Sequence, residues 1–162
     1  MKKIILLLIV FSIHNGIMAQ EKEKINNLLD AWHNAASNTD FNTYFGFLTE
    51  DAIYIGTDAT ENWNKIAFQA FAKPYFDKGK AWSFTALERN IYFAKDQETA
   101  WFDELLNTQM KICRGSGILV KTDGIWKIKH YVLSMTIPNS NTDEVTKIKA
   151  TVEDKLIETL RK

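Results

Sequence analysis

Apolar residues recur at intervals of three and four in four stretches of the chain, and this spacing is typical of amphipathic helices. The predicted helices span residues 20–37, 41–48, 63–76 and 142–162. The last of them begins with two acidic residues and ends with two basic ones, which suits the helix dipole at both ends. The pattern therefore predicts three helices in the first half of the chain and one at its end.

The stretches between these helices favour β-strands. A short strand is predicted at residues 51–56, a long one at 82–93, and three more between 100 and 138, with the sequences AWFDELLN, RGSGILVK and IWKIKHYVLSM. Helices come first and a run of antiparallel strands follows, which indicates an α+β fold. We expect N-terminal helices on one face of a curved antiparallel sheet, with a further C-terminal helix.

The first nineteen residues have the organisation of a secretory signal. Lys2 and Lys3 precede an unbroken apolar run, residues 4–11, and the small residue Ala19 stands at a cleavage position. The run is shorter than the roughly 20 apolar residues that span a bilayer, although an N-terminal membrane anchor is the alternative. We expect a signal peptide at residues 1–19, a domain at 20–140 and a helical extension at 141–162. The mature protein would then be exported, periplasmic or secreted, with no membrane span.

The composition restricts the partners and cofactors that the chain can use. The 20 basic and 20 acidic residues balance, and no basic tract is present, which disfavours nucleic acid as a partner. Aromatic residues make up 12% of the chain, which suits a ligand cavity lined with rings. Cys113 is the only cysteine, and no Cys/His cluster has the spacing of a zinc site. We expect a small-molecule ligand, no metal and no cofactor.

The last hairpin of the predicted sheet allows two registers. A three-residue loop at 122–124 sets Val120 opposite Trp126. A two-residue loop would instead turn Lys127 and Lys129 toward the apolar side. We therefore predict the three-residue loop, which keeps both lysines away from the apolar side. The choice of loop matters because a change of register by one residue exchanges the two faces of a strand.

The hairpin before it brings opposite charges together. A two-residue turn at 108–109 sets Asp103 directly opposite Arg114, which is a favoured cross-strand pair. One face of the sheet is then a mostly apolar wall with a few convergent polar groups, as in many ligand sites. Its members are Trp101, Asp103, Arg114, Ser116, Ile118, Val120, Trp126, Ile128, His130 and Val132.

The opposite face of the predicted sheet is also apolar and needs a cover. It holds Phe102, Leu119, Tyr131, Leu133 and Met135, together with Glu104. Because helices cover only one side of such a sheet, we expect a second copy of the chain on this side, in a homodimer through the sheet. His33, on the first helix beside Trp32, is expected at the surface or at the rim of the pocket.

The pocket wall carries residues that suit acid–base chemistry. We take Asp103, Arg114 and His130 as the candidate catalytic residues, because an arginine-held carboxylate can orient water or take a proton, and histidine carries protons near neutral pH. The alternative is a structural ion pair that braces the sheet. The candidate ligand-binding residues are Trp101, Ser116, Tyr54, Trp63 and Trp126. Tyr54, Trp63 and Tyr75 are candidates for the pocket mouth, with the polar loop 57–62 as its lid. Each of the mouth aromatics fits a packing role equally well.

Several of these strings resemble a known family. AWHNAASNTDFNTYFGFLTEDAIYIGTD, FAKPYFDKGKAW, AWFDELL, CRGSGILV and WKIKHYVLSMTIPN are similar to the SnoaL-like branch of the nuclear transport factor 2-like superfamily, over roughly residues 25–139. The resemblance implies a cone-shaped α+β fold with a deep pocket, and commonly a dimer through the sheet. Members of the superfamily include isomerases, epoxide hydrolases, cyclases, dehydratases and non-catalytic binding modules, so fold alone does not select an activity.

These observations lead to one expectation and two alternatives. The chain is expected to be an exported pocket protein for a small, largely hydrophobic organic molecule that carries a carbonyl, hydroxyl or carboxylate. The first alternative is an acid–base enzyme of isomerase, hydrolase, dehydratase or cyclase type that uses the pocket carboxylate. The second is a structural dimer whose cavity is filled by side chains.

Overall fold

The computed structural model describes the backbone of residues 2–161 and the side chains of residues 18–161. The elements in chain order are α1 (Lys2–Ser37), α2 (Phe41–Gly46), β1 (Leu48–Ile55), β2 (Asn62–Asn64), α3 (Lys65–Asp77), β3 (Thr85–Phe93), β4 (Thr99–Thr108), β5 (Lys111–Thr122), β6 (Ile125–Met135), the 3-10 turn η1 (Asn139–Asn141) and α4 (Thr142–Leu160). The predicted α+β class is confirmed. The short strand β2, at the start of the predicted third helix, is an addition.

The six strands form one sheet in the order β2-β1-β6-β5-β4-β3. All neighbours are antiparallel except β1 and β6, which run parallel. The sheet is therefore mixed, whereas a purely antiparallel sheet was predicted. The chain leaves β1, passes through β2 and α3 to the far edge of the sheet, and returns strand by strand until β6 lies beside β1. A local sequence pattern carries no information about such a long-range pairing.

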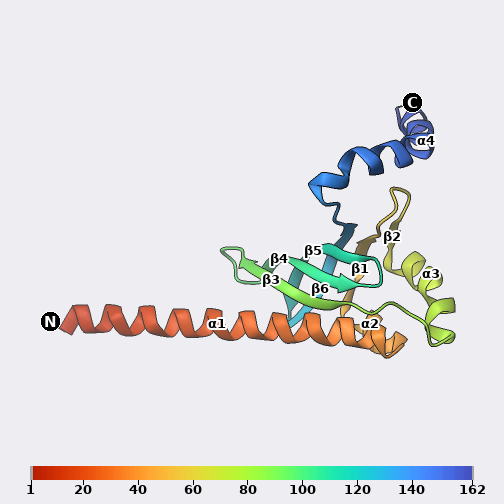
Figure 1. Cartoon of the computed structure of the whole chain (residues 1–162). Helices are drawn as coiled ribbons and strands as arrows, with labels where there is room; N and C mark the ends of the chain where they lie inside the picture. The colour runs from red at the N-terminus through yellow and green to blue at the C-terminus, as the bar shows by residue number, and fades with distance from the viewer. Residues whose placement is uncertain (1, 162) are drawn as a thin grey trace.

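The helices α1, α2 and α3 lie on one side of the sheet, and the N-terminal half of α1 extends past the sheet edge (Figure 1). The core fills the space between these helices and the inner face of the sheet. Its fully buried side chains include Trp32, Tyr44, Phe68, Phe102 and Tyr131. The helix starts are fixed locally, since the side chains of Asp40 and Asn64 accept hydrogen bonds from the backbone of α2 and α3.

A buried carboxylate ties α1 to the β5–β6 hairpin. Oε2 of Glu21 accepts hydrogen bonds from Lys121 Nζ at 2.8 Å and from Trp126 Nε1 at 2.7 Å, and Oε1 accepts from Lys24. The hydrogen bonds from Lys121 and Lys24 contribute most to lowering the pKa of Glu21 to about 2. This contact fixes α1 against the β5–β6 hairpin.

The predicted three-residue loop between β5 and β6 is wrong. Asp123 and Gly124 form a two-residue turn with positive φ at both positions, and Val120 pairs with Lys127. Val120 and Lys127 do share a face, but it is the one turned away from the helices. Farther along β6 the pairing with β5 shifts by one residue: Leu119 pairs with Ile128, but its neighbour Ile118 pairs with His130. A bulge of this kind resets the alternation of side chains.

The bulge reconciles the two-residue turn with a buried apolar face. Trp126 and Ile128 before it, and Tyr131 and Leu133 after it, all point inward and are buried. Lys129 lies at the shift, and its Nζ forms an ion pair with Asp51 at the surface. Both lysines thus stay out of the core without the longer loop that the sequence favoured.

The register of the β4–β5 hairpin also differs from its prediction. Asp103 pairs with Ser116, and Arg114 pairs with Leu105, so Asp103 does not face Arg114. The turn lies one residue later than predicted because the Thr108 side chain stabilises it. Its Oγ1 donates a hydrogen bond to the Lys111 carbonyl and accepts one from the Met110 amide, both at 2.9 Å.

Most of the residues assigned to the two faces therefore lie on the face opposite to the predicted one, whereas Trp126 and Ile128 of the predicted pocket wall stay on the helix side. The predicted dimer residues Phe102, Leu119, Tyr131 and Leu133 form the core beneath the helices. The opposite face, which we call the outer face, carries Trp101, Asp103, Arg114, Ser116, Ile118 and His130. Both faces carry apolar as well as polar residues. The face that the helices cover becomes the interior.

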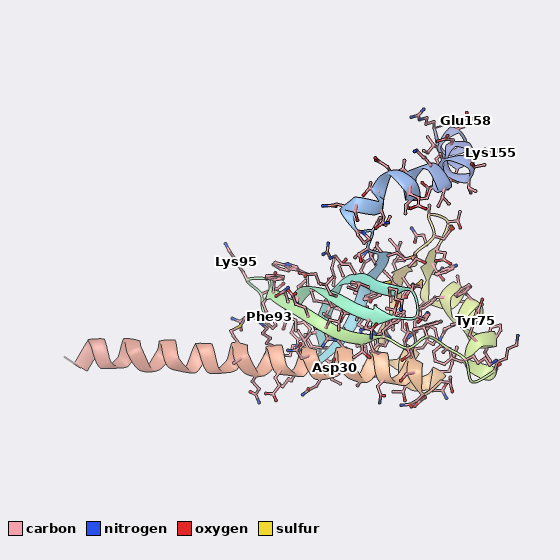
Figure 2. The ribbon with its side chains drawn as sticks, viewed as in Figure 1. Asp30, Tyr75, Phe93, Lys95, Lys155 and Glu158 are labelled. Carbon is pink, nitrogen blue, oxygen red and sulfur yellow. The ribbon has the colours of Figure 1, made fainter. Side chains whose placement is uncertain are left out.

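The C-terminal helix α4 stands apart from the sheet, and no residue along it is buried (Figure 1). Its side chains, among them Lys155 and Glu158, project into open space on all sides (Figure 2).

We expect that removal of residues 142–162 changes the melting temperature of the domain by less than about 3 °C, because α4 removes almost no apolar surface from water. Calorimetry of the two chains checks this prediction. A markedly lower melting temperature for the shortened chain would show that α4 stabilises the domain.

Candidate functional site

An aromatic cavity of about 170 Å³ lies between α3, the β1–β2 loop and the β4–β5 turn. Its lining residues come from distant parts of the sequence: Tyr54, Gly56, Thr57, Glu61, Trp63, Phe68, Phe71, Trp82, Phe84, Gln109, Met110 and Leu133. Phe71, Trp82 and Gln109 also line an adjoining groove of about 480 Å³. The two spaces together are large enough for a small organic ligand.

The rings of the cavity form a stack centred on Phe68. Tyr54 stacks on Phe68 with ring centroids 3.9 Å apart, and Trp63 and Trp82 lie nearly parallel to Phe68 at 5.6 and 5.8 Å. Phe71 stacks on Trp63 at 4.5 Å. Neighbouring rings of this kind hold each other in place, so the cavity presents fixed aromatic surfaces.

The polar groups of the cavity come mainly from the β1–β2 loop. Oε2 of Glu61 accepts a hydrogen bond from the Asp58 amide at 3.1 Å, and the Gly56 amide donates to the Glu61 carbonyl at 2.9 Å. A Cβ at position 56 would lie 2.1 Å from Glu61 Oε2, so glycine permits the carboxylate to fold over the loop. Burial, and then the charge of Glu61, raise the pKa of Tyr54, which keeps this hydroxyl neutral.

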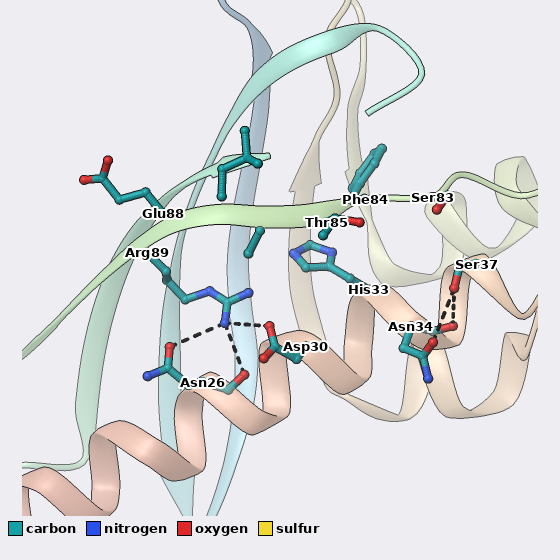
Figure 3. Close-up of a pocket in the computed structure, with 12 residues that line it drawn as sticks. Asn26, Asp30, His33, Asn34, Ser37, Ser83, Phe84, Thr85, Glu88 and Arg89 are labelled. Carbon is teal, nitrogen blue, oxygen red and sulfur yellow. Dashed lines mark hydrogen bonds and ion pairs between the residues drawn. The ribbon is translucent and has the colours of Figure 1, made fainter. Parts of the chain in front are cut away.

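A third space, of about 550 Å³, is an open groove between α1 and β3 (Figure 3). It is polar, with Asn26, Asp30, Asn34, Ser37, Ser83, Thr85 and Glu88 among its lining residues. His33 and Arg89 also line it, and both side chains are almost fully buried. The ring of Phe84 belongs to this groove and to the aromatic cavity, and lies between the two.

Behind this groove lies a network of ionic groups around Glu104. Oε1 of Glu104 accepts hydrogen bonds from His33 Nε2 at 2.9 Å and from the Tyr131 hydroxyl at 3.3 Å, while Oε2 accepts from Arg89 Nε at 2.9 Å. Arg89 Nη1 also pairs with Asp30 at 2.9 Å and donates to the Asn26 carbonyl. The network joins β3 and β4 to α1.

The charge of Glu104 is stabilised although the residue is only 1% exposed. Burial raises the pKa of this carboxyl, but the hydrogen bond and charge of His33, followed by those of Arg89, outweigh burial and hold the pKa below its usual value. Nη2 of Arg89 is buried without a hydrogen-bond partner in the described part of the chain.

The three predicted catalytic residues lie outside all three of these spaces. Asp103, Arg114 and His130 are on the outer face, where Asp103 accepts a hydrogen bond from Asn90 at 3.2 Å. Their role in catalysis stays a prediction. Trp101 and Ser116 share this face, and Trp101, which is 46% exposed, stacks on Tyr92.

The remaining predicted ligand-binding residues lie on the helix side. Tyr54 and Trp63 line the aromatic cavity, and the predicted lid contributes Thr57 and Glu61. Trp126 is buried, but it contacts Glu21 at the start of the domain instead of the cavity.

The sequence reasoning missed His33, Arg89 and Glu104. Glu104 was expected at a dimer interface and His33 at the surface or at the pocket rim, and Arg89 was not singled out. The available signal was the alternation of β4, which sets Glu104 on the same face as Phe102 and Leu106. To identify that face as the interior, one would have had to recognise that a residue of α1, His33, is the partner of the Glu104 carboxylate.

Two further properties follow from the described part of the chain. Its His, Cys, Asp and Glu side chains form no group of three or more that could hold a metal ion. None of its described helices has the length and hydropathy needed to cross a membrane.

Comparisons with known proteins identify the fold. Residues 25–138 match the model of the SnoaL-like domain. A search of curated proteins found no match. An NTF2-like protein of unknown function from Pseudomonas putida KT2440 has a similar structure, with a TM-score of 0.63 at 16% identity, covering 76% of this chain and 92% of that one.

Two other solved structures have a similar fold. A putative aromatic ring hydroxylase from Novosphingobium aromaticivorans has a TM-score of 0.63 at 14% identity, covering 74% of this chain and 92% of its own. The association domain of C. elegans CaMKII has a TM-score of 0.59 at 22% identity, covering 73% and 97%. At these identities the likeness concerns the fold alone.

Proposed function

Because the chain belongs to the SnoaL-like family of the nuclear transport factor 2-like superfamily, we propose that it binds a small, largely hydrophobic organic molecule in the cone between helices and sheet. The observation that carries this proposal is the aromatic cavity, with parallel rings from β1, β2, α3 and the segment before β3. A concave, mostly apolar space with a few polar groups is the usual form of such a site.

Substitution of the cavity tryptophans tests this proposal. We expect Trp63→Ala and Trp82→Ala each to weaken the binding of tert-butylbenzene about tenfold, because each removes a ring surface from the ligand. Ligand-observed NMR titration measures the affinity. Trp101→Ala on the outer face is the matched control and should leave the affinity unchanged. If Trp101→Ala weakened binding while the two cavity variants did not, the ligand would lie on the outer face.

The second candidate function is acid–base catalysis at the groove between α1 and β3. The specific observation is the pair of His33 and Glu104, since a buried carboxylate that orients an imidazole is a common arrangement for proton transfer. Hydrogen–deuterium exchange of the acetophenone methyl group in D2O, followed by NMR, tests it. An enzyme of this type speeds the exchange and loses this effect in His33→Asn. Exchange no faster than in buffer would contradict the enzyme function.

We further propose that the protein is exported and that the signal ends at Ala19. The position of Glu21 supports this, because it is the first buried residue among the side chains described from residue 18 onward, and it follows the proposed cleavage site by two residues. Mass spectrometry of the exported protein should give a chain that begins at Gln20. A full-length chain retained in the cells would contradict this proposal.

A homodimer through the outer face is the proposed assembly. This face presents Tyr92, Trp101 and Ile118 to solvent, and large exposed apolar surfaces commonly mark interfaces. The fold is shared with a domain that is named for association, the C. elegans CaMKII domain.

We expect light scattering to show a dimer at micromolar concentration and Ile118→Glu to convert it to a monomer, because a charge at the centre of an apolar interface loses its hydration. Ile66→Glu, at a residue that is 76% exposed on α3, should leave the dimer intact. A wild-type monomer would contradict the proposal.

A further inference from the structure

The charged groups around the aromatic cavity indicate which charge the ligand carries, which the apolar lining alone does not. Among the described lining residues, Glu61 is the only one with a charged side chain. Lys80 lines the adjoining groove and is absent from the cavity itself. The other polar lining groups are neutral: the side chains of Thr57 and Gln109 and the hydroxyl of Tyr54. A ligand held within the cavity itself therefore meets a single negative charge, and only a ligand that extends into the adjoining groove also meets Lys80.

The rings around this charge add to the negative potential. The face of an aromatic ring attracts a cation, and tryptophan does so most strongly. Trp63 and Trp82 are each nearly parallel to Phe68, and Phe71 stacks on Trp63. Several aromatic rings and one half-buried carboxylate that line a single concave space are the elements by which proteins recognise ammonium groups that carry apolar substituents.

The Glu61 carboxylate is held in place by its own loop. Oε2 is anchored by the Asp58 amide and lies over Gly56, where any larger residue would collide with it. Oε1 receives no hydrogen bond from any residue in the described part of the chain. One oxygen thus fixes the side chain, while the other remains available to a ligand.

We infer that the ligand of the aromatic cavity is an organic cation, an amine or quaternary ammonium compound with apolar substituents. The inference rests on the proposed small-molecule function and narrows its ligand class. It disfavours the carboxylate that the sequence left open, because Glu61 repels a second anion and no cation in the cavity compensates for it. The neutral Tyr54 hydroxyl adds no charge of its own.

A pair of isosteric probes tests the inference. Phenyltrimethylammonium and tert-butylbenzene have the same shape and differ in one charge. We expect the cation to bind at least about tenfold more tightly than the neutral probe in ligand-observed NMR titrations, and benzoate not to bind. We expect Glu61→Gln to remove most of the difference between the two probes, because glutamine keeps the acceptor for the Asp58 amide and removes the charge.

The control is Glu98→Gln, which makes the same change of net charge at an exposed residue on the β3–β4 turn. It should leave both affinities as they are in the wild type. Equal binding of the cation and the neutral probe, or an equal loss of both in Glu61→Gln, would overturn the cation inference while the small-molecule function stands. Failure of both probes to bind would overturn the inference and the proposed function together.

Discussion

Replacing Glu104 with alanine is expected to lower the free energy of unfolding by about 3–5 kcal/mol. The substitution leaves the buried Arg89 guanidinium with Asp30 as its only anionic partner, and it removes the acceptor of His33 and Tyr131. Removing one member of a buried ionic group is costly because the remaining charges stay away from water. Urea denaturation measures the loss.

The neighbouring residue provides a matched control. Asp103 is on the same strand, but its side chain is on the outer face, so Asp103→Ala should change the stability by less than about 1 kcal/mol. Equal effects of the two substitutions, or a larger effect at Asp103, would mean that the assignment of the two faces is wrong.

The same network makes stability depend on pH. The pKa of Glu104 is lower in the folded protein than in the unfolded chain, where it is about 4.3. Its contribution is therefore complete above that pH and is lost as the pH falls through the folded value. The wild type should lose stability on acidification below about pH 4.3, and Glu104→Ala should lose less. Part of the acid sensitivity should remain in the variant, because Glu21 also has a lowered pKa.

Replacing Gly117 with alanine is expected to destabilise the fold by about 1–3 kcal/mol through overpacking. A Cβ at this position would lie 2.5 Å from the His130 carbonyl oxygen and 2.8 Å from the Phe102 ring. The backbone oxygen belongs to the β5–β6 ladder and moves only if the strands separate. Thermal denaturation of the variant checks the expectation.

Gly46 offers the opposite environment. No atom lies within 4 Å of a Cβ added there, and its φ is not positive, so Gly46→Ala should be neutral or slightly stabilising through the unfolded state. If the two glycine substitutions had the same effect, close contact at Gly117 would not be the cause of destabilisation.

Local pattern predicted the elements of this fold because burial against one layer leaves a periodic signal. The stripe of Ile25, Leu29 and Trp32 is buried in α1, and the strands from residue 99 to 135 lie close to their predicted limits. The direction of β1 relative to β6 left no such signal, because it depends on the long connection through α3.

The candidate site was only partly predictable for a different reason. Tyr54 and Trp63 were placed at a pocket mouth beside a polar loop, and both line the aromatic cavity, while their role in ligand binding stays a prediction. The trio of Asp103, Arg114 and His130 drew attention because its charges looked complementary in one register, but the Thr108 side chain and the bulge at Lys129 set another. Glu104 is recognisable as a core residue only once His33 and Arg89 are placed around it.

The central claim is that the ligand occupies the aromatic cavity on the helix side of the sheet. A crystal of the protein soaked with bromobenzene tests it most directly, because the anomalous signal of bromine locates the ring without ambiguity. We predict a bromine peak among Trp63, Phe68 and Trp82. A peak found only on the outer face, beside Trp101 and Asp103, would contradict this account.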